Sequence, residues 1–130
     1  MRTMQRPFLV EDVLVLQTAS HDEPLLSIYA NDSAVADILP LFVSNVPKYL
    51  GNLEAHIGSS DWAMAARVCH DLKGTAGGYG YPDIGGVAKR LETEVKGARS
   101  LDILNGLLAE AKILCERAKR ALPDARIDAP

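Results

Sequence analysis

The chain has 130 residues, of which 48% are hydrophobic and 5% aromatic, so it is long enough for one domain whose core consists mainly of aliphatic side chains and alanine. Its net charge of −3 gives no electrostatic reason to expect nucleic acid or an anionic membrane as a partner. No apolar run approaches the roughly 20 residues of a membrane-spanning helix, so we expect a cytoplasmic protein whose partners are soluble proteins.

The first 32 residues are expected to form an N-terminal segment that packs on the rest of the domain. Residues 9–16 fit either a short helix or an extended segment, and Pro24 interrupts any regular structure after them. The apolar residues after this proline are expected to cover one end of the domain: Leu25, Leu26, Ile28 and Tyr29. The cluster Asn31-Asp32-Ser33 then favours the start of a helix.

Four amphipathic segments come next, each with apolar residues spaced three and four apart. The first covers about residues 33–57 and the second about residues 60–79. The third begins near residue 82, and the last covers about residues 100–122. Pro40 and Pro47 lie inside the first segment, where each removes a backbone donor, so we predict a kink or a break near one of them.

These segments predict an all-α fold, an antiparallel four-helix bundle over residues 33–122 with an additional short N-terminal element over residues 1–32. Residues 123–130 lack apolar periodicity and are expected to form a disordered tail. Cys69 and Cys115 occupy positions in which a small apolar residue is wanted. Both are therefore expected to be buried free thiols, which fits a reducing cytosol.

The second helix places His70 away from its apolar stripe, which consists of Ala65, Val68, Cys69, Leu72, Ala76 and Tyr79. The neighbours of His70 one and two turns away are all small: Ala63, Ala66, Gly74 and Gly77. Glycine in a helix interior costs roughly 0.5 to 1 kcal/mol relative to alanine. The glycines therefore indicate a function, which is to let another macromolecule approach an exposed imidazole closely.

Two basic residues flank His70 on the same helix. Lys73 lies one turn after the histidine and brings an ammonium group within reach of any group that the ring carries. Arg67 lies one turn before it and is interpreted either as a further positive charge at the site or as a solvated side chain. A solvent-facing imidazole is mostly neutral at cytosolic pH, as a nucleophile must be.

The run His70-Asp71-Leu72-Lys73-Gly74, followed by Gly80 and by Leu91-Glu92, resembles the His-x-Leu-Lys-Gly signature of histidine-containing phosphotransfer (HPt) domains. The resemblance covers about residues 33–122. It implies that His70 is the phosphoacceptor, that Lys73 stabilises the phosphoryl group and that Gly74 leaves clearance for a receiver domain. Ala66, Arg67 and Gly77 are expected to belong to the same partner-binding surface.

The resemblance further implies a phosphocarrier of a His-Asp phosphorelay in two-component signal transduction, without an ATP-binding or kinase module. The implied partners are response-regulator receiver domains and a sensor (hybrid) histidine kinase, and we expect a monomer. No cofactor of its own is expected, because the receiver would supply Mg²⁺. Met1 and the short tail favour a free-standing protein over a domain cut from a hybrid kinase.

Two other functions remain open, the phosphoacceptor domain of a chemotaxis-type kinase and a receiver-docking module that works without phosphate. Asp71 also resembles the acidic residue of dimeric sensor-kinase helices, but Lys73-Gly74-Thr75 departs from their pattern of a basic residue, Thr or Asn, and Pro. No metal site is expected, because the three histidines lack ligand spacing. No nucleotide-binding glycine loop and no activated serine are recognised.

Overall fold

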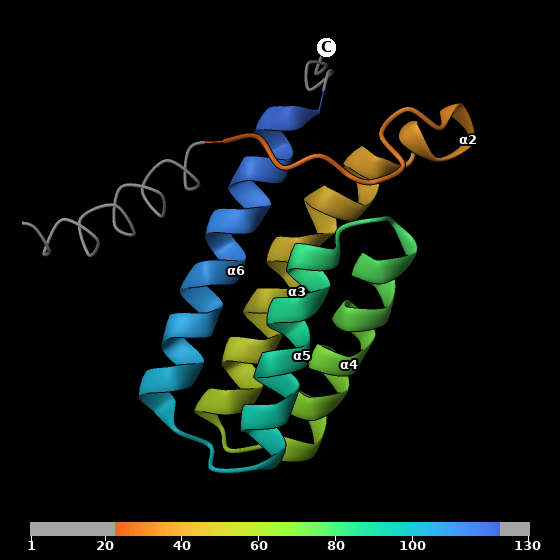
Figure 1. Ribbon diagram of the computed structural model, residues 1–130. Helices are drawn as coiled ribbons and strands as arrows, with labels where there is room; N and C mark the ends of the chain where they lie inside the picture. The colour runs from red at the N-terminus through yellow and green to blue at the C-terminus, as the bar shows by residue number, and fades with distance from the viewer. Residues whose placement is uncertain (1–22, 123–130) are drawn as a thin grey trace, which may run out of the picture.

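The computed structural model describes residues 23–122, so the expectations for residues 1–22 and for the tail over residues 123–130 lie outside the described residues. The described residues form five helices and no strand: α2 (Ser33–Ala36), α3 (Leu39–Gly58), α4 (Trp62–Gly78), α5 (Pro82–Lys96) and α6 (Leu101–Ala121). The four long helices lie side by side, and each short connection reverses the direction of the chain (Figure 1). The all-α fold is confirmed.

Local sequence signals set the helix ends. The side chain of Asp61 accepts a hydrogen bond from the backbone N–H of Met64 at the start of α4, and Ser100 does the same for Ile103 at the start of α6. The predicted first helix is interrupted between α2 and α3, because Pro40 lies in the first turn of α3 and has no N–H with which to continue a preceding helix. The predicted break near a proline is confirmed.

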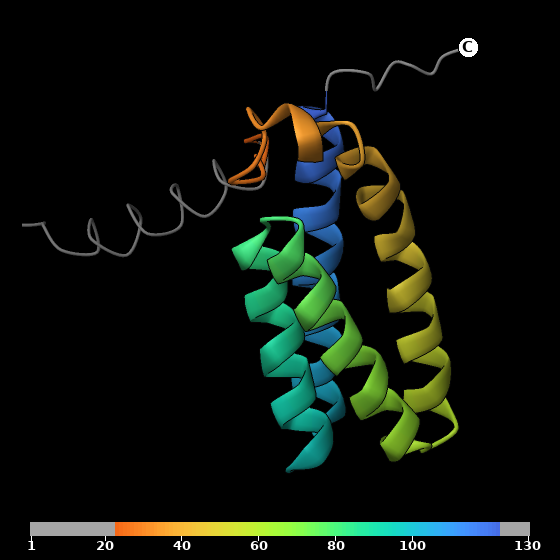
Figure 2. The same cartoon turned by 90° about the vertical axis from the view of Figure 1, so that its right-hand side faces the viewer.

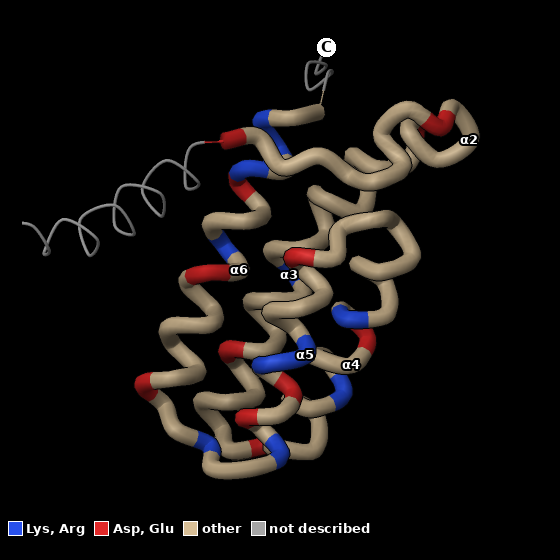
Figure 3. The backbone as a smooth tube through the Cα atoms, in the orientation of Figure 1, with Lys and Arg blue, Asp and Glu red and all other residues tan. Residues whose placement is uncertain are grey.

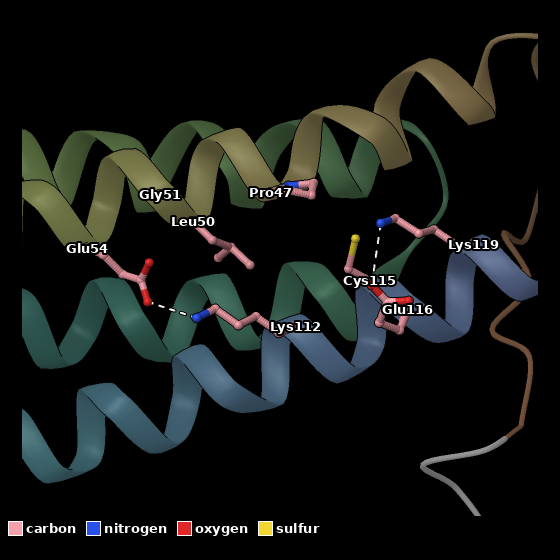
Figure 4. Close-up of a pocket in the computed structure, with 8 residues that line it drawn as sticks. All are labelled: Pro47, Leu50, Gly51, Glu54, Lys112, Cys115, Glu116 and Lys119. Carbon is pink, nitrogen blue, oxygen red and sulfur yellow. Dashed lines mark hydrogen bonds and ion pairs between the residues drawn. The ribbon is translucent and has the colours of Figure 1, made fainter.

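Pro47 remains inside α3 and leaves the carbonyl oxygen of Val43 without the usual helical donor four residues later. The thiol of Cys115 on α6 compensates, because its Sγ lies 3.6 Å from that oxygen and donates to it. Figure 4 shows Pro47 and Cys115 facing one groove between α3 and α6, which the ion pair between Glu54 and Lys112 crosses at 2.9 Å. Both cysteines are buried and free, as predicted.

The core is aliphatic, with a small aromatic cluster at one end of the bundle. Its buried side chains come from all four long helices and include Val46, Leu53, Leu72, Leu91 and Leu104. Phe42 stacks on Tyr79 and on Tyr81, with ring centroids 5.1 and 5.6 Å apart. None of the helices within residues 23–122 combines the length and the hydropathy needed to cross a membrane.

The segment before α2 crosses the end of the bundle at which α3 begins and α6 ends, and both orientations show it there (Figures 1 and 2). The Ser27 hydroxyl donates to the carbonyl oxygen of Tyr79 at 2.6 Å, and the Ile28 N–H donates to that of Gly80 at 2.8 Å. Gly80 has a φ of +82°, and a Cβ there would lie 2.5 Å from the Ser27 Oγ, so glycine is required.

One expectation for this segment was wrong. Leu26, Ile28 and Tyr29 were predicted to cover the end of the bundle, but their side chains are exposed. Only Leu25 packs against the core. The segment is held mainly by backbone hydrogen bonds and by Ser27 rather than by its apolar side chains.

Candidate functional site

His70 lies midway along α4, and its side chain is 67% exposed. This is the outward orientation that the helical wheel predicts, because Ala65, Cys69, Leu72 and Ala76 of the same helix are buried. A Cβ added at Gly74 or at Gly77 would meet no atom within 4 Å, so the glycines open the surface beside the ring. Ala66 is half-buried, and Arg67 is exposed on the same side of α4.

The imidazole stands between two open hollows. Tyr49, Asp71, Gly74 and Thr75 line the one toward α3. The other opens toward α5 and is lined by Ala63, Ala66, Arg67, Asp71, Glu92 and Lys96. A partner can therefore reach the ring from either side. The predicted residues Ala66, Arg67 and Gly74 border these hollows with His70, whereas the predicted residue Gly77 borders neither.

Glu92 of α5 connects His70 to two lysines, and only 9% of its side chain is exposed. Its Oε2 lies 3.4 Å from His70 Nδ1 and 2.9 Å from Lys96 Nζ, while its Oε1 lies 3.0 Å from Lys73 Nζ. Glu92 is a charged residue that does not face the solvent, because α4 packs against α5 and covers the carboxylate.

The close approach of α4 and α5 explains this burial. Gly85 of α5 faces the backbone of α4, where a Cβ would lie 3.5 Å from the carbonyl oxygen of Lys73. The helices therefore pack closely enough for Lys73 of α4 to reach a carboxylate on α5. The i,i+4 spacing of Glu92 and Lys96 was visible in the sequence, but no sequence signal joins either residue to His70.

The two lysines determine the charge of Glu92. The hydrogen bond from Lys96 lowers its pKa most, burial of the carboxylate opposes this, and the hydrogen bond and charge of Lys73 lower it further, to about 2. Glu92 is therefore a carboxylate at any physiological pH. It can accept a hydrogen bond from a proton-bearing Nδ1 of His70 but cannot donate to it.

This lowered pKa makes the stability of the protein depend on acid pH. The carboxylate contributes stability above its ordinary pKa of 4.5, and this contribution is lost as the pH falls from there toward about 2. We expect wild type to lose about 2 to 3 kcal/mol more than Glu92→Gln over that range. Thermal unfolding followed by circular dichroism between pH 2 and pH 7 measures the difference.

Glu110→Gln is the matched control, because the carboxylate of Glu110 forms a 2.9 Å ion pair with Arg90 but is far more exposed than that of Glu92. Its removal is expected to change the acid dependence by less than about 1 kcal/mol. Equal acid sensitivity in wild type and Glu92→Gln would contradict the assignment of the acid-labile stability to Glu92.

A second group of polar residues borders the hollow toward α3. The hydroxyl of Thr75 donates to the carbonyl oxygen of Asp71 at 2.8 Å, and the Tyr49 hydroxyl lies 3.4 Å from the Thr75 Oγ1. Since the Thr75 proton is already used, Tyr49 is the donor in this pair. Tyr49 is half-buried, packs against the core and lies at the edge of the site.

The remaining candidate nucleophiles and ligands do not join this site. Cys69 precedes His70, but burial raises the pKa of its thiol to about 12, with a smaller contribution from Glu92, so it is not a thiolate. His56 lies near the C-terminal end of α3, where its Nδ1 is 4.0 Å from Asp61 Oδ2. His21 is outside the described residues. Within residues 23–122, no group of three or more His, Cys, Asp or Glu side chains could hold a metal ion.

Basic and acidic residues are interspersed along the long helices in Figure 3. The charge cluster at His70 is therefore not part of a single-sign stripe among the described residues that would suit nucleic acid. Its distinguishing property is a local one, an exposed ring backed by a buried carboxylate with two lysines.

Comparison with known proteins agrees with the geometry. The Hpt domain family matches residues 37–124, which include α3, α4, α5 and α6. No curated protein and no solved structure matches the chain. Hpt domains are phosphocarrier modules of His-Asp phosphorelays that interact with receiver domains and histidine kinases and have no kinase activity of their own. The exposed histidine thus lies in a chain that belongs to the Hpt domain family.

Proposed function

We propose that His70 accepts a phosphoryl group from the aspartyl phosphate of one receiver domain and passes it to the aspartate of another. The observation that carries this proposal is the exposed imidazole with its Nδ1 toward a buried carboxylate. Glu92 can only accept a hydrogen bond, so it favours the ring form with the proton on Nδ1. That form leaves the lone pair on Nε2, which becomes the nucleophile.

In the transfer, the Nε2 lone pair attacks the phosphorus and forms the N–P bond while the bond from phosphorus to the aspartate oxygen breaks. The aspartate leaves as a carboxylate, and the proton on Nδ1 remains beside Glu92. The ring gains positive charge as the N–P bond forms, and the Glu92 carboxylate 3.4 Å away stabilises that charge. We propose that the receiver supplies the Mg²⁺ for this step.

The surface around His70 supports docking of a receiver domain. Gly74 leaves the surface beside the ring open, and Ala66 adds only a methyl group. Arg67, Lys73 and Lys96 supply positive charge near the ring, which complements the acidic pocket of a receiver. The protein is proposed to act as a monomer, with one receiver bound over His70 at a time.

The test is to mix the protein with a receiver domain carrying a labelled aspartyl phosphate. We expect the label to appear on the protein without ATP, in an acid-labile and alkali-stable form, and to map to residue 70 by mass spectrometry. Label that appears only with a kinase and ATP would instead support the phosphoacceptor domain of a chemotaxis-type kinase. Receiver binding with no label would support a docking module that works without phosphate.

Lys73→Ala tests the cation assigned to the phosphoryl group. We expect the phosphorylated form to have a lifetime or yield lower by about five- to thirtyfold, because a charge-assisted contact worth about 1 to 2 kcal/mol is lost. The bundle should stay folded, because Lys96 still pairs with Glu92. Decay of purified phosphoprotein measures the effect, with Lys112→Ala as a control far from the ring. An unchanged lifetime and yield would remove Lys73 from the mechanism.

A further inference from the structure

The orientation of the His70 ring determines on which side of α4 a group bonded to Nε2 lies. Nδ1 is 3.4 Å from Glu92 Oε2, so this nitrogen faces α5. The two nitrogens of an imidazole point toward nearly opposite sides of the ring, so Nε2 points away from α5. Because α4 packs between α5 and α3, the side away from α5 is the side of α3. A group bonded to Nε2 therefore borders the hollow toward α3.

This hollow offers both room and hydrogen-bonding groups for a phosphoryl group. It has a volume of about 420 Å³, is open to the solvent and is lined by Tyr49, His70, Asp71, Gly74 and Thr75. Gly74 contributes no side chain, so the space next to the ring stays free. An ionised Asp71 has only acceptor atoms and cannot bind a phosphoryl oxygen. The side-chain donors of this hollow are therefore the hydroxyl groups of Tyr49 and Thr75.

Of these two hydroxyl groups, that of Tyr49 has the proton that is free to turn. The Thr75 hydroxyl donates to the carbonyl oxygen of Asp71 at 2.8 Å, a strong bond within α4. Within residues 23–122, the Tyr49 hydroxyl makes one hydrogen bond, to Thr75 Oγ1 at 3.4 Å, which is longer than the usual O–H···O range of about 2.5 to 3.0 Å. A charged phosphoryl oxygen is a much better acceptor than this hydroxyl oxygen.

The position of the Tyr49 hydroxyl is fixed by the packing of its ring. Tyr49 belongs to α3, and its half-buried side chain packs against the core while it lines the hollow beside His70. A tyrosine with an anchored ring and a polar tip at the surface presents its donor with little loss of side-chain entropy. The core thus holds a hydrogen-bond donor on the side of the imidazole that faces away from Glu92.

We propose that the Tyr49 hydroxyl donates a hydrogen bond to an oxygen of the phosphoryl group on His70 and so binds this group from the side of α3. The role of Tyr49 depends on the proposed function of His70, because Tyr49 acts on the group that His70 carries. Lys73 supplies a charge to the same phosphoryl group from a flexible side chain. Tyr49 supplies a neutral donor that the core holds in place.

Tyr49→Phe tests the proposal, because it removes the hydroxyl and keeps the ring that packs against the core. At a saturating concentration of phosphorylated receiver, the rate of label transfer to His70 is expected to fall about tenfold, since one hydrogen bond to a charged group is lost. The affinity for the unphosphorylated receiver should stay within about twofold of wild type, because the transferred group is absent from that complex.

Phosphoramidate, a small phosphoryl donor, extends the test to a reaction without a receiver. Its P–N bond breaks as the bond from phosphorus to His70 Nε2 forms, and the leaving group departs as ammonia. The rate of this labelling should also fall about tenfold in Tyr49→Phe, because the lost hydrogen bond belongs to the protein and not to the receiver. Mass spectrometry confirms that the label is on residue 70.

Two further variants serve as controls. Tyr79→Phe removes the hydroxyl of another half-buried tyrosine, which borders neither hollow at His70, and it should accept label at the wild-type rate. Thr75→Val removes the present acceptor of the Tyr49 proton but leaves the Tyr49 hydroxyl in place. Its rate should therefore fall by less than about threefold.

Four results would overturn the role of Tyr49. They are a wild-type rate in folded Tyr49→Phe, an equal loss in Tyr79→Phe, a loss in Thr75→Val as large as that in Tyr49→Phe, and a loss seen with the receiver but not with phosphoramidate. The third would mean that Tyr49 acts through Thr75, and the fourth that it contacts the receiver. Absence of label on residue 70 of the wild-type protein after mixing with a phosphorylated receiver would overturn the proposed function instead.

Discussion

His70→Gln is expected to abolish phosphoryl transfer from a receiver while leaving the bundle folded. Glutamine is similar in length to histidine, but its amide nitrogen has no available lone pair and cannot form the N–P bond. The His70 side chain is 67% exposed, so its loss removes little packing, and the stability should change by less than about 1 kcal/mol. Transfer of label from a phosphorylated receiver, followed over time, should fall at least a thousandfold, to background.

The control for this experiment is His56→Gln. His56 is a half-buried histidine on α3 whose ring lies 4.0 Å from Asp61, and it borders neither hollow at His70. This variant should accept label through His70 at the wild-type rate. Full labelling of His70→Gln would mean that another residue carries the phosphoryl group, and the central assignment would then be wrong.

Gly74→Gln is expected to weaken receiver binding by at least tenfold without unfolding the protein. Gly74 borders the hollow beside His70, and a Cβ there meets no atom within 4 Å, so the added side chain extends into the space that the partner must occupy. A tenfold change in affinity corresponds to about 1.4 kcal/mol, and a steric clash in a close interface costs several times that amount. Titration of the variant with a receiver domain measures the loss.

Gly106→Gln on α6 is a well-matched control. Gly106 is also an exposed helical glycine with open space around its Cβ position, but it borders neither hollow at His70. Both substitutions should stabilise their helices by up to about 0.5 to 1 kcal/mol, because glycine is a poor helix former. Normal receiver affinity for Gly74→Gln would contradict the clearance argument, and equal loss in both variants would point to a general effect of added bulk.

The sequence predicts the orientation of His70 but not the contacts of Glu92. The orientation of His70 and its small neighbours followed from residues on one helix, where side chains three and four apart share a face. The Glu92 contacts did not follow, although Glu92 belongs to the signature that the sequence shows. The contacts of Glu92 with Lys73 and His70 join residues 19 or more positions apart on α4 and α5. Its contact with Lys96 lies within one helix, but the burial of the carboxylate comes only from the packing of α4 against α5.

The amino-acid sequence by itself determined the four long helices, an interruption near one of two prolines, the buried cysteines and the outward histidine. Each of these depends on local periodicity or on the backbone chemistry of one residue. Only the tertiary structure decided that Glu92 is buried between two lysines and the ring, that Tyr49 borders the site and that Leu26 and Ile28 face the solvent. The reason is that the distance between two helices, and hence which polar side chains they enclose, is set by the packing of both helices together.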